Sequence, residues 1–171
     1  MVKGVTVTSS IITISGQTSE LAPGTMEEEQ VSLSLDILNR EVLLVYAIDI
    51  NTSKPEAIAG VNTFAEASLS STSRATIGRI SDTNVLGQAS KAIRAAGFVD
   101  GGVSFSEVSP ETPTANALDY VGIIATNDFF VQVKGFGNLA PVSADWRMWC
   151  ARAQVTADIY AALVQGEVLS S

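Results

Sequence analysis

The chain has 171 residues, of which 46% are apolar and 16% charged, and it contains no histidine. The missing histidine excludes Ser-His-Asp and Cys-His nucleophiles, His-ligated zinc and proximal-His haem, so no cofactor of these kinds is expected. The 10 basic and 18 acidic residues give a net charge of −8, which argues against a nucleic-acid-binding face because phosphate contacts need clustered Lys and Arg.

Alternation of apolar and polar residues predicts strands in the N-terminal half of the chain. Residues 1–20 are rich in Ser, Thr and β-branched residues, which is typical of a strand or an extended arm. Residues 27–38 alternate strongly and predict a half-buried strand, and we interpret the three glutamates at its start as a solvated edge. Residues 41–50 are apolar on both faces, which favours a central strand, although periodicity alone also permits a helix there. The two residues between these runs, Asn39 and Arg40, are few enough for a hairpin.

The middle of the chain is richer in Ser, Thr and Ala. Two modest strands are predicted at residues 61–70 and 73–80. Residues 82–84, Asp-Thr-Asn, can cap a short amphipathic helix near 83–96, which Gly97 closes. This is the only helix that the sequence predicts with a defined start and end.

The C-terminal part of the chain predicts four more strands separated by turn-forming residues. They lie at residues 103–108, 120–126, 129–136 and 146–164, and a polar, proline-containing loop is expected at 110–116. The last run alternates cleanly and contains β-branched residues, so we expect a strand, although its Ala-rich end is also compatible with a helix.

We therefore predict an all-β fold, an eight-stranded antiparallel β-sandwich of the jelly-roll type with one short helix near 83–96. The length fits one domain with a substantial core, and composition shows neither a repeat nor a linker. Residues 1–171 are thus expected to form a single domain with 1–20 as an extended N-terminal arm. Cys150 is the only cysteine, so intrachain disulfides are excluded, and its apolar surroundings predict a small buried thiol.

Two motif-like segments fail because of their context. Residues 135–140, Gly-Phe-Gly-Asn-Leu-Ala, match the dinucleotide-binding pattern, but Pro141 follows and no helix N-terminus is predicted to meet a pyrophosphate. Residues 49–53 resemble the start of a calcium-binding loop, but the positions that need Gly and Glu hold Lys54 and Gly60. Neither segment predicts a metal site or a catalytic residue.

Aromatic residues beside an arginine form the most specific cluster. Side chains alternate along a strand, so Trp146 and Trp149 are expected on opposite faces, one entering the core and one facing outward. Phe129 and Phe130 repeat this pattern. Trp, Tyr and Arg are enriched at interface hot spots, which favours contact with a neighbouring subunit or a sugar ring. The candidate subunit-interface residues are Phe129, Phe130, Trp146, Arg147 and Trp149. The alternative is that both tryptophans pack within the fold.

The C-terminal third resembles a known family of viral coat subunits. Its segment GIIATNDFFVQVKGFGN, followed by a loop and WRMWCARAQVTADIYAALVQGE, is similar in arrangement to the last strands of single jelly-roll coat proteins. The likeness is to the small major capsid proteins of tailless icosahedral double-stranded DNA viruses of archaea and thermophilic bacteria. In that family a strand carrying paired aromatics leads to a long final strand, preceded by hairpins like residues 27–50. The resemblance is a pattern of strands rather than a diagnostic motif.

The resemblance implies a structural protein of the virion, which self-assembles into capsomers and an icosahedral shell, often above an internal membrane, without catalysis or a cofactor. Its expected partners are copies of itself and other capsid proteins. Coat subunits that touch the genome often carry a basic N-terminal arm, whereas this N-terminus has only Lys3. Direct nucleic-acid binding is therefore not expected, and residues 1–20 are expected to contact neighbouring subunits.

Composition favours such a role independently. Many Ala, Ser, Thr and Val residues with few Lys give surfaces that lose little side-chain freedom on contact, and the mean hydropathy of +0.28 is high for a free monomer. A second hypothesis is a carbohydrate-binding or adhesive β-sandwich module that uses Trp149 or Tyr160 as a stacking platform. A third, a cupin-type jelly-roll enzyme, is disfavoured because such sites rest on histidine ligands.

Overall fold

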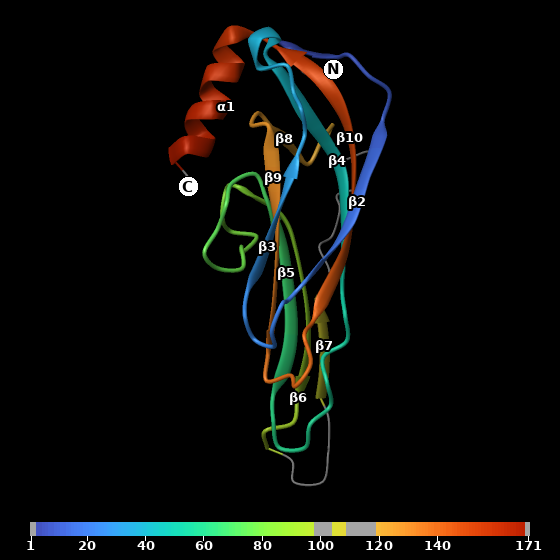
Figure 1. Cartoon of the computed structure of the whole chain (residues 1–171). Helices are drawn as coiled ribbons and strands as arrows, with labels where there is room; N and C mark the ends of the chain where they lie inside the picture. The colour runs from blue at the N-terminus through green and yellow to red at the C-terminus, as the bar shows by residue number, and fades with distance from the viewer. Residues whose placement is uncertain (1–2, 98–103, 109–118, 170–171) are drawn as a thin grey trace.

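The computed structural model describes residues 3–97, 104–108 and 119–169. Figure 1 shows an elongated molecule made of two layers of strands, with helix α1 (Ala157–Leu169) at the same end as the N-terminus. The predicted loop at 110–116 lies outside the described residues.

The first layer, sheet A, is built around the longest strand, β10 (Ser143–Val155). One side of β10 pairs with β1 (Val5–Val7) and β2 (Ile12–Ser19), and the other side pairs with β4 (Glu41–Thr52), which in turn pairs with β8 (Gly122–Ile124). All of these pairings are antiparallel.

The second layer, sheet B, is also antiparallel throughout. Its strands follow the order β3 (Glu27–Ser32), β9 (Asp128–Phe136), β5 (Thr63–Ser70), β6 (Val85–Arg94) and β7 (Ser104–Val108).

The pairing pattern defines a jelly roll. With β1 and β7 set aside, the first strand β2 pairs with the last strand β10, the second strand β3 with β9, and the third strand β4 with β8. The middle strands β5 and β6 pair with each other. This order is that of one long hairpin folded over into two facing sheets, the double Greek key of jelly rolls. The predicted fold class is confirmed.

The strand predicted at 27–38 ends earlier than expected. β3 stops at Ser32, and a single 3-10 turn, η1 (Ile37–Asn39), precedes β4. The hairpin predicted at Asn39 and Arg40 is wrong, since β3 and β4 lie in opposite sheets. The physical reason is that residues 33–40 connect the two layers, with the side chains of Leu33 and Leu35 buried in the core on the way.

The helix predicted near 83–96 is wrong, because these residues form β6, and no strand forms at 73–80. The apolar spacing of this segment fits either structure, and pairing with β5 decides for the strand. Small residues on the inner face make this possible: a Cβ atom added to Gly87 would lie 3.2 Å from a methyl carbon of Ile48 in the facing sheet.

The α-helix found among the described residues lies where we preferred a strand. β10 ends at Val155, and α1 follows immediately. Residues 157–164 contain three alanines, and Ala has the highest helix propensity, so the Ala-rich end of the run is helical. Among the described residues, no helix has the length and apolar character needed to cross a bilayer.

The segment expected as an extended arm contributes two strands to the subunit itself. β1 and β2 pair with β10 over residues 5–7 and 12–19. The single-domain organisation remains a prediction.

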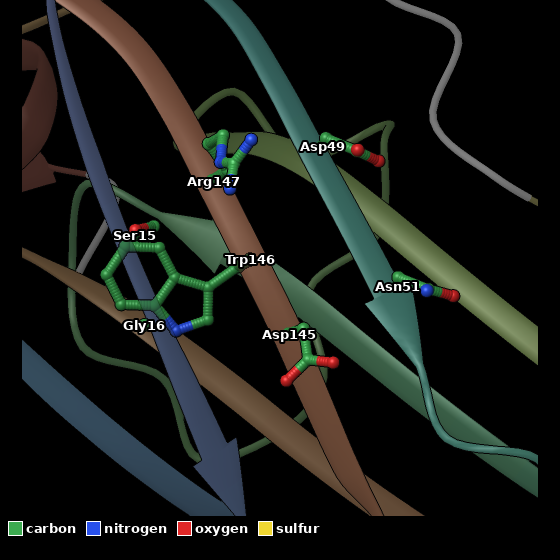
Figure 2. A pocket seen from close by; sticks show the side chains of 7 residues that line it. All are labelled: Ser15, Gly16, Asp49, Asn51, Asp145, Trp146 and Arg147. Carbon is green, nitrogen blue, oxygen red and sulfur yellow. The ribbon is translucent and has the colours of Figure 1, made fainter.

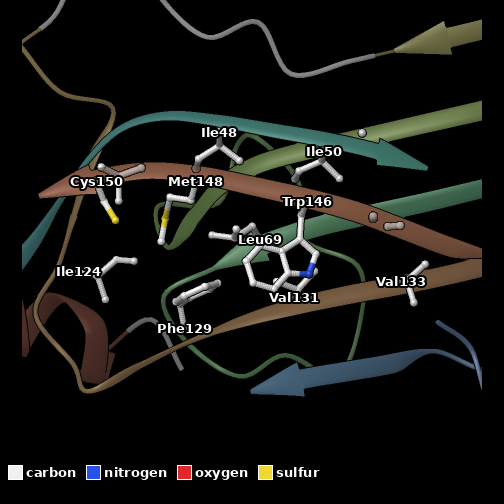
Figure 3. Close-up of a cluster of buried hydrophobic side chains, with 14 of the residues drawn as sticks. Ile48, Ile50, Leu69, Ile124, Phe129, Val131, Val133, Trp146, Met148 and Cys150 are labelled. Carbon is white, nitrogen blue, oxygen red and sulfur yellow. The ribbon is translucent and has the colours of Figure 1, made fainter. Parts of the chain in front are cut away.

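The main core lies between the sheets (Figure 3). Apolar side chains of β4, β8 and β10 face those of β5 and β9 there. Cys150 is a buried free thiol, as predicted. Burial raises the pKa of this thiol to about 11, although the positive charge of Arg152 opposes the shift. The thiol therefore stays protonated near neutral pH.

A second apolar cluster lies on the other face of sheet A. The side chains of Val42 and Leu44 alternate with those in the main core and meet Ala153 and Val155 of β10. Four partly buried residues of α1 pack against this cluster, namely Ile159, Tyr160, Leu163 and Val164. The helix thus covers part of the outer face of sheet A.

Candidate subunit-contact surfaces

Two of the five predicted interface residues belong to the core, so their assignment to an interface is wrong. Phe129 is fully buried and Trp146 is 4% exposed. Their rings meet edge to face, with centroids 5.5 Å apart, and the Trp146 Nε1–H donates to Thr18 Oγ1 over 3.2 Å. Gly16 leaves room for the indole, since an added Cβ would lie 2.5 Å from the ring. Both aromatics therefore stabilise the sandwich from within (Figure 3).

The other three predicted residues lie on the outer faces. Arg147 is exposed and Trp149 half-buried on sheet A, where the guanidinium carbon lies 5.8 Å from the centre of the indole ring. Phe130 is half-buried on β9 of sheet B, opposite Gln30 and Ser70. The five residues do not form one surface, and only Arg147 and Trp149 are neighbours on an outer face.

Arg147 borders a shallow hollow on the outer face of sheet A (Figure 2). The hollow has a volume of about 460 Å³ and is bordered by side chains of both charges. Its lining residues are Ser15, Gly16, Asp49, Asn51, Asp145, Trp146 and Arg147. Gln17 Nε2 donates to Asp145 Oδ1 over 2.8 Å, and Lys91 Nζ donates to Asn51 Oδ1 over 2.7 Å. The hollow therefore offers a polar contact surface on a rigid sheet.

Exposed apolar side chains also occur in the loops at the end of the molecule opposite α1, at positions that the sequence did not predict as contacts. Leu21 is 82% exposed and Leu139 is 80% exposed. Phe136 is also exposed and stacks on Phe64 with ring centroids 4.9 Å apart. We call Leu21, Phe64, Phe136 and Leu139 the loop-end patch. A leucine set among Gly, Pro and Asn is the sequence signal that marks such a position.

Two glutamates fix the loops that carry this patch. Glu20 is buried and accepts hydrogen bonds from the backbone N–H groups of Gly135 (2.7 Å) and Val142 (3.0 Å). Glu56 accepts from the N–H groups of Leu139 and Ala140. Charge-assisted hydrogen bonds of this kind are stronger than neutral ones. The apolar side chains are thus presented on an ordered backbone, which lowers the entropy cost of contact.

Part of the outer face of sheet B is covered by the loop of residues 71–84. Beneath this loop Gln132 is fully buried: its Nε2 donates to Glu28 Oε2 (2.8 Å) and Ser70 Oγ (2.9 Å), and its Oε1 accepts from Ser68 Oγ (2.7 Å). The loop closes the network because the Arg74 N–H donates to Glu28 Oε2 over 2.8 Å.

The interpretation of the glutamates at 27–29 as a solvated edge is wrong for two of them. Glu28 belongs to the buried network, and Glu29 accepts a hydrogen bond from Thr18 Oγ1 over 2.5 Å. Each connects β3 to a neighbouring element, so their role is structural.

A buried carboxyl group on α1 stands apart from these surfaces. Glu167 Oε1 accepts from the Ala125 N–H over 3.3 Å, and its Oε2 has no hydrogen-bond partner among the described residues. Burial raises the pKa of Glu167; the Ala125 N–H and the Thr126 hydroxyl oppose this, and the charge of Asp128 adds to it. Within the described part of the chain no group of three or more acidic or cysteine side chains is placed to hold a metal ion.

No protein-family model matches the chain, and no curated protein matches its sequence. Its fold is similar to three solved viral structures. Desmodium yellow mottle tymovirus is 14% identical, with a TM-score of 0.33 over 86% of this chain and 90% of that one. Trichodysplasia spinulosa-associated polyomavirus VP1 is 6% identical, with a TM-score of 0.41 over 90% and 100%. Cocksfoot mottle virus is 12% identical, with a TM-score of 0.33 over 86% and 93%. At these scores the fold assignment rests on the strand order.

Proposed function

We propose that this chain is a structural coat subunit that assembles with copies of itself into the capsomers of an icosahedral virion shell. The observation that carries the proposal is the strand order, in which the first strand pairs with the last and the middle two with each other. This jelly roll serves viral capsids, lectins and cupins, and the absence of histidine disfavours the cupin type. The resemblance of the C-terminal third favours the coat of a tailless double-stranded DNA virus.

The surfaces support self-association. The loop-end patch presents apolar side chains that Glu20 and Glu56 hold in place. Arg147 and Trp149 add a polar and aromatic surface on sheet A, and aromatic residues and arginine are typical anchors of interfaces. The net charge of −8 disfavours direct contact with nucleic acid.

The test is the oligomeric state of the purified chain. Light scattering during size-exclusion chromatography, over a range of concentration and salt, is expected to show assemblies larger than one subunit, and negative-stain microscopy to show discrete particles. A chain that stays monomeric under all of these conditions contradicts the coat proposal.

A second candidate, a carbohydrate-binding module, is favoured by one observation. Trp149 is partly exposed, and its neighbour Arg147 borders a hollow that also contains Asp49, Asn51 and Asp145. An aromatic face beside hydrogen-bonding side chains suits a sugar ring. Retention on a glycan array that Trp149→Ala abolishes would support this function, and no retention of the native chain would exclude it.

A further inference from the structure

The edge of sheet A formed by β1 and β2 has no partner strand among the described residues. Both strands pair with the same side of β10, and no described strand pairs with their other side. Side chains along this edge are exposed, including Val7, Ile11 and Ile12. The edge therefore presents apolar side chains and backbone hydrogen-bonding groups to a partner.

The chemistry of this edge is unusual for an edge strand. Residues 4–19 contain no charged residue and no proline. Exposed edges are normally protected from pairing with other chains by lysines, prolines or bulges. The irregular residues 8–11 interrupt the edge between β1 and β2, but β2 itself runs for eight residues without such protection.

The edge of sheet B provides the contrast. β3 lies at that edge and begins with three consecutive glutamates, residues 27–29. Pairing of two β3 strands would bring negative charges of both copies together, which is unfavourable. Pairing of two β2 strands brings together only neutral side chains.

We propose that β2 of one subunit pairs antiparallel with β2 of a second copy, so that their A sheets join into one continuous sheet. This inference rests on the proposed function, because it names the surface through which copies of the coat subunit meet. A two-fold contact uses the same surface on both copies, and it needs an edge that is complementary to itself. A neutral edge meets this requirement and adds no like-charge repulsion between two subunits of net charge −8.

The contact belongs to a known mode of recognition, in which a strand is added to a free sheet edge and backbone hydrogen bonds supply the affinity. The short side chains of Thr13 and Ser15, both exposed, lose little freedom when the edge is covered. Ile12 gains apolar contact in the same step.

The experiment compares the native chain with the double variant Thr13→Lys/Gln17→Lys, which places two charges on the edge. The control, Thr76→Lys/Ser81→Lys, adds the same charge at two exposed positions of the loop 71–84. Light scattering gives the assembly size, and hydrogen exchange gives the protection of residues 12–19. Ser15→Lys repeats the test with one charge if the double variant does not fold.

In the assembled native chain the β2 amides that point away from β10 should exchange hydrogen at least about tenfold more slowly than in the dissociated subunit. The edge variant should yield smaller species and lose this protection, while the control behaves as the native chain. Native assembly that the edge variant leaves unchanged, with no protection of β2, overturns the pairing but leaves the coat function standing. A native chain that never assembles overturns both.

Discussion

The outer faces of the two sheets are covered in different ways. The loop 71–84 covers part of sheet B through buried polar groups around Gln132. Helix α1 covers part of sheet A through apolar side chains and leaves the hollow beside Arg147 open. A buried polar group needs each of its partners in place, whereas apolar contacts are non-directional. The cover of sheet B should therefore be more sensitive to substitution than the cover of sheet A.

The largest effect is expected from Gln132→Ala. This change removes three hydrogen bonds, so the buried Ser68 hydroxyl loses its acceptor and the Ser70 hydroxyl loses a donor, and it opens a cavity. We expect a loss of about 2–4 kcal/mol in the free energy of unfolding, measured by denaturant titration. The matched control is Gln30→Ala, an exposed glutamine with one hydrogen bond to Asp128, which should cost less than about 1 kcal/mol. Equal losses in the two variants would contradict a buried network.

A smaller effect is expected when the apolar cover of sheet A is weakened. Leu163 is partly buried against the second cluster, so Leu163→Ala should cost about 1–2 kcal/mol in the same titration, less than a fully buried leucine. Leu169→Ala, at an exposed position of the same helix, should have almost no effect. A cost for Leu163→Ala above that for Gln132→Ala would reverse the comparison.

The cover of sheet A should also depend on pH through Glu167. Because the pKa of this carboxyl is raised in the folded chain, docking of α1 is most stable below the ordinary value of about 4.5. Stability should then fall as pH rises from there through the raised pKa. Glu167→Gln keeps the group uncharged and should remove this fall, measured as the thermal midpoint between pH 4 and 8. Glu66→Gln on sheet B is the control, and a pH profile that Glu167→Gln leaves unchanged would contradict the role of Glu167.

The smallest effect on stability is expected on the open part of sheet A. Arg147 is exposed, so Arg147→Ala should change the free energy of unfolding by less than about 0.5 kcal/mol. If the open face contacts other subunits, the same variant should shift the assembly to higher concentration in light scattering. A large loss of monomer stability would show that Arg147 belongs to the fold rather than to a contact.

The sequence predicted those elements in which alternation coincides with burial. β9 is such a strand, and β4 was predicted from a run that is apolar on both faces, where periodicity alone also permitted a helix. It did not predict β6, because Gly87 and Ala89 are too small to define a face and their spacing fits a helix equally well. The boundary between β10 and α1 was missed for a related reason: the alternation of Val155, Ala157 and Ile159 continues smoothly across it.

The candidate surfaces were predictable only in part. The spacing of Trp146 and Trp149 placed them on opposite faces, and the structure agrees. Which of the two enters the core depends on the facing sheet, where Phe129 meets Trp146, and no local pattern contains that information. The loop-end patch was missed because the order of residues 135–142 comes from hydrogen bonds to Glu20 and Glu56, which are far from that segment in the sequence.

The pairing of the first strand with the last has a consequence for how the subunit is made. β10 lies between β2 and β4, so sheet A lacks its middle strand until residues 143–155 have left the ribosome. Contacts between such distant segments form slowly, and unpaired strands exposed meanwhile are prone to aggregation. Synthesis of β10 therefore times the closure of the sandwich, and the β2 edge that we propose as a contact becomes ordered only after β10 has paired with it.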